Sequence, residues 1–125
     1  MIKNENSGQI EVTNEFGSVY LYTHDLAHDL MHVVYDVLSK KERWNDADYL
    51  ARMLFCKMIP LEMWNKSEGF GIGTQMYADI KFLINIDVVK QKISVNNWNE
   101  TGSACRGIHY TFKDFIENFT SDASL

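Results

Sequence analysis

The chain has 125 residues, a formal net charge of −5 and a pI of about 5.3, and its length fits one domain. Apolar residues make up 46% of the chain and aromatic residues 13%, which is enough to bury a core. The acidic balance disfavours nucleic acid as a direct partner, because phosphate backbones repel it. No apolar run could cross a membrane and the N-terminus has no secretory core, so we expect a cytoplasmic protein without a membrane partner. We also expect no cofactor.

The first predicted element is a β-hairpin. Residues 9–13 alternate between polar and apolar side chains, and residues 18–22 are rich in β-forming types. Between these strands, Asn14 to Gly17 is typical of a turn in which Gly17 can adopt a positive φ.

Two helices are predicted next. Thr23 offers an N-cap for the first helix, which should end near Ser39. Its apolar stripe at helical spacing consists of Leu26, Leu30, Val33, Val34 and Val37. Asn45 or Asp46 should cap the second helix, and Pro60 should end it. The second helix has little polar surface, so we expect it to be the more buried of the two.

The second half of the chain returns to β structure after an irregular segment at residues 61–78. Residues 80–86 alternate, and residues 92–96 run back after a turn, which indicates a second hairpin. Thr111 opens a short helix that carries aromatic residues. The order ββααββα predicts an α+β fold in a single domain, with two hairpins forming one antiparallel sheet and helices packed on a face.

Three histidines, His24, His28 and His32, recur at every fourth position of the first predicted helix. His24 and His32 would stand about 12 Å apart along the axis, at 1.5 Å per residue, so one metal ion cannot bind all three. Two of them could bind zinc together with a distant ligand. The helical wheel places them beside the apolar stripe, which favours a solvated helix edge or a pH-sensitive surface that contacts a partner.

The cysteines and the glycine-rich segment give weaker signals. Cys56 and Cys105 lack metal-ligand spacing, so we expect free thiols, with Cys56 buried and inert in the second helix. Gly69, Gly71 and Gly73 precede a strand and no lysine follows them, which favours a shaped loop over a phosphate site.

Two stretches in the second half carry a family resemblance. GFGIGTQMYADIKFLINIDVVKQKISV, at residues 69–95, has a glycine-bearing loop, a strand that ends in Asp87 and a return strand. YTFKDFIENF, at residues 110–119, has a helix that starts with Thr-Phe and continues with Phe-Ile. These features resemble bacterial toxin-immunity proteins, including those of contact-dependent growth inhibition. The resemblance implies a protein that binds a cognate toxin domain, often a nuclease with a basic cleft, and occludes its active site.

The leading hypothesis is therefore a non-catalytic immunity or inhibitor protein. Its acidic residues would fill a basic cleft of the toxin domain. The predicted partner-binding face comprises Asp25, Asp29, His32, Asp36, Glu42 and Asp46. One alternative is a small metal-dependent enzyme that uses His28 and His32 with Asp79 or Asp87. A second is a mobile-element-encoded inhibitor of a host protein, which shares the mechanism but not the partner.

Overall fold

The computed structural model describes residues 7–24, 27–63, 70–76, 81–97 and 107–122. The elements in chain order are β1 (Gly8–Asn14), β2 (Gly17–Thr23), the 3₁₀ turn η1 (Ala27–Asp29), α1 (Leu30–Leu38), α2 (Ala47–Met63), β3 (Phe70–Gly73), β4 (Phe82–Asp87), β5 (Lys92–Asn97), β6 (Ile108–Thr111) and α3 (Phe112–Asp122). The α+β class is confirmed. The predicted order ββααββα is wrong, because the described order is ββααββββα.

The strands form one mixed sheet in the order β3-β2-β1-β4-β5-β6. The two predicted hairpins are β1–β2 and β4–β5, and both are antiparallel. They join through a parallel pair of β1 and β4, in which Gly8 lies opposite Phe82 and Thr13 lies opposite Asp87. The expected purely antiparallel sheet is therefore wrong. The chain crosses over through α1, α2 and β3 before it enters β4, so β4 runs in the direction of β1.

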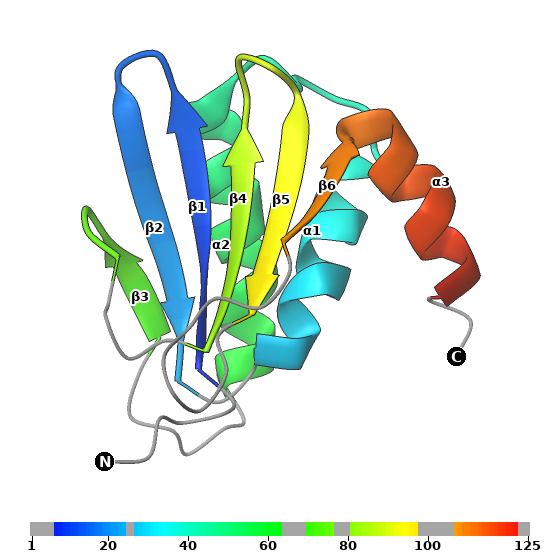
Figure 1. Ribbon diagram of the computed structural model, residues 1–125. Coiled ribbons are helices and arrows are strands. Elements are labelled where there is room, and N and C mark those ends of the chain that lie inside the picture. The colour runs from blue at the N-terminus through cyan, green and yellow to red at the C-terminus, as the bar shows by residue number, and fades with distance from the viewer. Residues whose placement is uncertain (1–6, 25–26, 64–69, 77–80, 98–106, 123–125) are drawn as a thin grey trace.

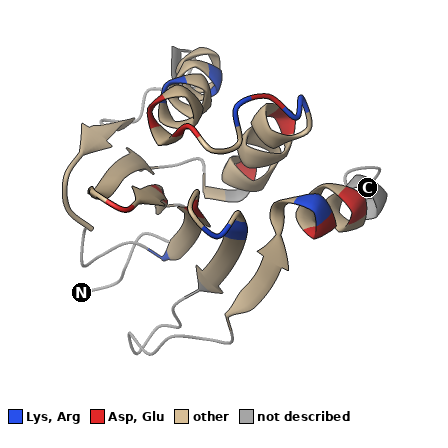
Figure 2. Cartoon of the chain, turned by 90° about the horizontal axis from the view of Figure 1, so that it is seen from above, with Lys and Arg blue, Asp and Glu red and all other residues tan. Residues whose placement is uncertain are grey.

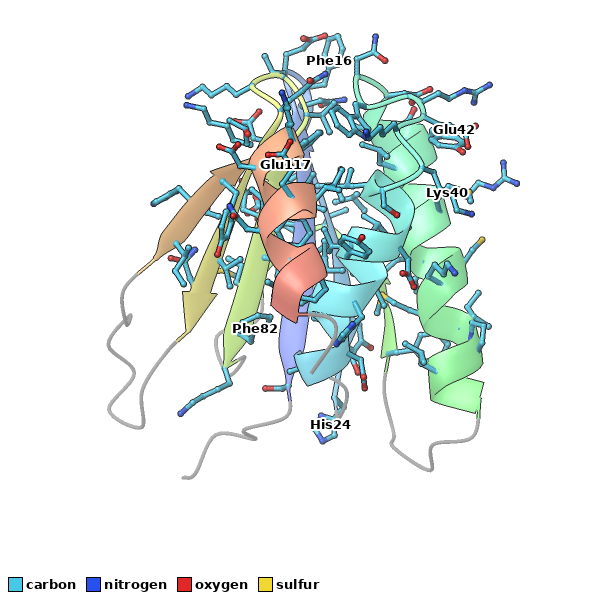
Figure 3. All side chains as sticks on the ribbon, turned by 90° about the vertical axis from the view of Figure 1, so that its right-hand side faces the viewer. Phe16, His24, Lys40, Glu42, Phe82 and Glu117 are labelled. Atoms are coloured by element: carbon cyan, nitrogen blue, oxygen red, sulfur yellow. The ribbon has the colours of Figure 1, made fainter. Side chains whose placement is uncertain are left out.

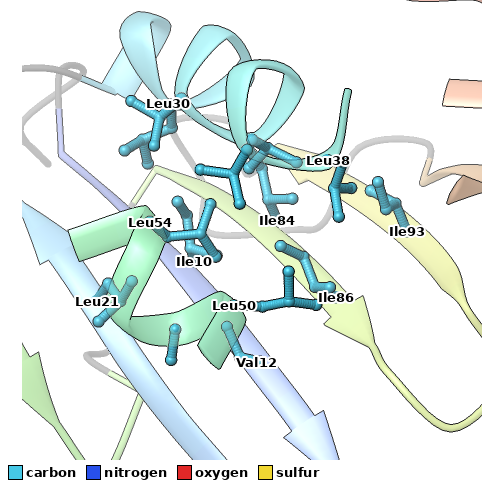
Figure 4. Packing of buried hydrophobic residues seen from close by; sticks show 14 of the residues in the cluster. Ile10, Val12, Leu21, Leu30, Leu38, Leu50, Leu54, Ile84, Ile86 and Ile93 are labelled. Atoms are coloured by element: carbon cyan, nitrogen blue, oxygen red, sulfur yellow. The ribbon is translucent and has the colours of Figure 1, made fainter. Parts of the chain in front are cut away.

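Helices α1 and α2 cover one face of the sheet, and α3 lies beside β6 (Figure 1). No described helix covers the opposite face, which we call the open face. The core lies between the covered face and the helices, where alternate strand residues meet the apolar sides of α1 and α2 (Figure 4). Its most buried aliphatic side chains include Ile10, Leu21, Leu30, Leu50, Ile84 and Ile93.

Helix α1 begins later than the sequence indicates. Thr23 is not its N-cap, because Thr23 stays in β2, pairs with Gly8 and is 1% exposed. The helix follows η1 and has Asp29 at its N-cap position, without a capping hydrogen bond from the side chain. Its end at Ser39 is confirmed, as is the buried stripe from Leu30 to Val37. Leu26 lies outside the described residues.

Helix α2 begins as predicted and ends later. Asp46 caps it, since its Oδ1 accepts the Tyr49 N–H at 3.0 Å. Pro60 does not end it, and α2 continues to Met63. A proline lacks the backbone donor and its ring crowds the carbonyl four residues earlier, and at Pro60 both effects fall on the last turns of the helix. The expectation that α2 is the more buried helix is wrong, because Cys56 and several neighbours are exposed.

Two short strands of four residues each, β3 and β6, form the edges of the described sheet and are absent from the prediction. Of the glycines expected to shape a loop, Gly71 and Gly73 lie in β3, and Gly69 lies outside the described residues. A Cβ at Gly71 would come within 2.9 Å of the Tyr22 ring, so a larger residue here would displace that ring. The predicted start of α3 is confirmed, because Thr111 Oγ1 accepts the Asp114 N–H at 3.0 Å.

Within the described ranges, no helix has the length and apolarity needed to cross a bilayer.

Candidate partner-binding surfaces

The three histidines do not form a stripe on one helix. His24 lies exposed after β2, His28 belongs to η1, and His32 lies in the first turn of α1. The His32 ring meets the Phe119 ring of α3 edge-on, with 5.1 Å between centroids. In Figure 3, His24 marks the end of the molecule opposite Phe16.

Of the residues suggested for a metal-dependent enzyme, His32 and Asp87 can be compared, and they lie at opposite ends of the sheet. Asp87 is the last residue of β4 and pairs with Thr13, whereas His32 lies in α1, which follows the opposite end of β2. Asp79 lies outside the described residues. No three His, Cys, Asp or Glu side chains within the described ranges are placed to hold one metal ion.

The described residues of the predicted acidic face lie on α1, in the connection after it and at the cap of α2. The Asp36 carboxylate lies 3.8 Å from the Lys57 ammonium of α2, and both side chains are exposed. Asp46 is engaged in capping α2. Asp29 sits at the N-cap position of α1. Asp25 lies outside the described residues, so its place on this face stays a prediction.

Glu42, the remaining member of that face, lies in the connection between α1 and α2 (Figure 3). It is exposed between two exposed cations, Lys41 and Arg43, which both adopt a positive φ, of 56° and 51°. Trp44 fixes this connection by donating its indole N–H to the Leu38 carbonyl at 3.0 Å. Cations therefore interrupt the acidic face here, which weakens its attraction for a basic partner.

The open face holds a carboxylate that sequence reasoning missed. Glu11, in the middle of β1, accepts hydrogen bonds at one oxygen from the hydroxyls of Ser18, at 2.7 Å, and Tyr20, at 3.0 Å. Its other oxygen accepts the Asn85 amide at 2.9 Å. Thr13 completes the group, 2.8 Å from Ser18 and 3.3 Å from Asn85 between hydrogen-bonding atoms. We call these five residues the Glu11 network.

All donors in the Glu11 network are neutral. Burial alone would raise the pKa of Glu11, but the hydrogen bonds from Ser18, Asn85 and Tyr20 outweigh it and hold this pKa below its usual value. Burial and the neighbouring Glu11 charge together raise the pKa of Tyr20. At neutral pH the network therefore consists of an ionised carboxylate and a protonated phenol, and Glu11 forms no ion pair within the described chain.

Strand alternation and register build this network. Ile10 and Val12 point to the helices, so Glu11 points to the open face. Tyr20 lies opposite Glu11 on β2, and Asn85 lies opposite it on β4. Alternation in the sequence could have placed Glu11 on a polar strand face. It could not have supplied Asn85, which lies 74 residues away and meets Glu11 only through the parallel pair.

A second surface lies at one end of the sheet, where both hairpin turns project. Because β1 and β4 are parallel neighbours, these turns lie at the same end, and the Val88 N–H donates to the Thr13 carbonyl at 2.9 Å. Each turn presents an apolar side chain to solvent: Phe16 is 89% exposed and Val89 is 59% exposed. The signal that could have indicated Phe16 is a large aromatic residue inside the turn predicted at Asn14 to Gly17.

Comparison of the chain with protein-family models, with curated proteins and with solved structures gave no match. The resemblance to toxin-immunity proteins therefore stays a prediction.

Proposed function

We propose that this protein is a non-catalytic inhibitor of immunity type, which binds a basic toxin domain and occludes its active site. The observation that carries the proposal is the Glu11 carboxylate on the open face, which is ionised and hydrogen-bonded by neutral groups alone. The net charge of −5 and the resemblance of the second half support the same partner class.

The charge of Glu11 is not balanced by a cation within the described part of the chain. A half-buried carboxylate attracts a cation at 4 Å by roughly 4 kcal/mol at an effective dielectric constant of about 20, before desolvation is subtracted. The neutral donors fix the carboxylate in place, so little side-chain entropy is lost when a partner's lysine or arginine binds. No described helix covers the face around it (Figure 1), and the neighbouring Ser18, Tyr20 and Asn85 side chains are polar. Such a surface can meet the rim of a basic cleft.

One end of the open face is already closed, which limits where a partner can bind. Gln9 points to this face yet is 0% exposed, and its side-chain amide donates to the Gln75 carbonyl at 3.3 Å. Glu11 lies two residues closer to the hairpin turns and is only half-buried. The accessible part of the face therefore extends from Glu11 towards those turns.

The test uses the polypeptide encoded by the gene immediately upstream, co-expressed with this protein and also titrated with it by calorimetry. We expect co-expression to relieve growth inhibition, and Glu11→Gln to weaken binding at least tenfold, which is roughly 1.4 kcal/mol. Glu117→Gln is the matched control, because Glu117 is exposed on α3, away from the open face (Figure 3). Protection that is undiminished by Glu11→Gln would show that the open face is not the binding surface.

The sequence-predicted face is tested in the same assay. Replacing Asp29 and Asp36 together with asparagine removes two of its carboxylates without reversing charge. Weaker binding by this double variant, with binding by Glu11→Gln unchanged, would assign the interface to α1 instead of the open face.

A further inference from the structure

An open hollow of about 330 Å³ lies between the β1–β2 turn and the first turn of α2. Its apolar lining includes Phe16, Val19 and Ala47, and its polar lining includes Asn14 and Asp48. This volume is at the small end of the range for ligand sites, about 300 Å³ and above, and suits a single side chain.

The walls of the hollow are held in place. Asn14 Oδ1 accepts the Phe16 N–H at 2.8 Å, and Gly17 adopts a φ of 142°, so the turn that carries Phe16 is fixed although its ring is 89% exposed. On the other side, the Asp46 cap fixes the first turn of α2. An exposed aromatic side chain on a fixed turn is well placed to anchor an interface, where aromatic residues are enriched.

The charge at the hollow favours a cation over an anion. Asp48 is exposed and forms no hydrogen bond or ion pair within the described chain. Glu15, next to Phe16, is exposed as well. The N-terminus of α2 would attract an anion, but the carboxylates of Asp46 and Asp48 already occupy its cap and first turn. Red segments mark the acidic residues of the β1–β2 turn and of the start of α2 in Figure 2, which views this end of the molecule.

We propose that the hollow binds an arginine side chain of the partner, with its guanidinium group between the Phe16 ring and the Asp48 carboxylate. The aliphatic part of that arginine packs against Val19 and Ala47. Arginine fits better than lysine, because a planar guanidinium stacks on an aromatic ring and bonds a carboxylate through two N–H groups. This inference rests on the proposed function, in that the partner is basic, and adds a second contact point at the end of the open face.

The test is an NMR titration of the ¹⁵N-labelled full chain with Nα-acetyl-arginine amide, with the lysine and citrulline analogues in parallel. We expect saturable shifts at Phe16, Gly17 and Asp48, with the lysine analogue at least threefold weaker and the neutral citrulline analogue without effect. Phe16→Ala and Asp48→Asn should each weaken arginine binding at least threefold. Both side chains are exposed, so these variants should keep the fold. Glu117→Gln serves as the control, because Glu117 lies on α3 and does not line the hollow.

Three results would overturn the inference. Shifts centred on Glu11, with none at the hollow, would assign arginine binding to the open face alone. Equal shifts with citrulline would remove the role of charge. Inorganic phosphate that shifts Asp48 would show an anion site at the start of α2. The titration needs no toxin domain, so its outcome is independent of whether the upstream polypeptide binds.

Discussion

The Glu11 network offers the most direct test of the electrostatics of the open face. The change Glu11→Gln keeps the shape of the side chain and removes its charge. The Gln oxygen can still accept hydrogen bonds from one side of the network, now as neutral bonds, whereas its NH2 group cannot accept from the donors that faced the other carboxylate oxygen. A hydrogen bond to a charged group contributes about 1.5–3 kcal/mol and a neutral one about 0.5–1.5, so each bond that is kept loses about 1 kcal/mol.

Solvent reduces this loss, because Glu11 is only half-buried and its interactions are partly screened. We therefore expect Glu11→Gln to lower the free energy of unfolding by about 1–2 kcal/mol at pH 7. For a chain of this length, that corresponds to a fall in Tm of roughly 5 °C. Urea unfolding followed by tryptophan fluorescence measures the difference, with Glu117→Gln as a control expected to stay within about 0.5 kcal/mol.

The stabilisation of the fold by the Glu11 charge should depend on pH. The folded pKa of Glu11 lies below its usual value, so its charged form stabilises the fold above the unfolded pKa of about 4.3. That contribution disappears as the pH falls through the lower, folded pKa. The stability difference between the parent chain and Glu11→Gln should therefore shrink in acid. A difference that stays constant from pH 7 down to the acid limit of the fold would refute the charged network.

Two further predictions concern single residues. Burial and Glu11 raise the pKa of Tyr20, so this pKa should fall towards its usual value in Glu11→Gln. Phenolate absorbance during alkaline titration measures the change. An unchanged pKa would mean that Glu11 does not act on the phenol. Lys41→Gly should raise the free energy of unfolding by about 0.5–1 kcal/mol, because glycine adopts the φ of 56° at this position without the strain of a side chain. A loss of stability in urea unfolding would contradict this prediction.

The sequence determined the elements that depend on local patterns. Strand alternation predicted the β1–β2 and β4–β5 hairpins, and helical spacing predicted the buried side of α1. The caps at Asp46 and Thr111 are likewise local, because each side chain bonds a backbone N–H three residues ahead. These features hold because the interacting groups are close in the chain.

The tertiary structure alone decided how these elements combine. The parallel pairing of β1 with β4 cannot be read from either strand, because it depends on where the crossover through the helices returns the chain. That pairing brings Asn85 to Glu11 and places Phe16 and Val89 at one end of the sheet. The edge strands β3 and β6 are four residues long, too short for periodicity to reveal, and they form by pairing with longer neighbours. The candidate surfaces on the sheet follow from these long-range contacts. The acidic helix face is read from local spacing and stays a prediction, and the fold adds to it only that Asp36 lies beside Lys57 and that Asp46 caps α2.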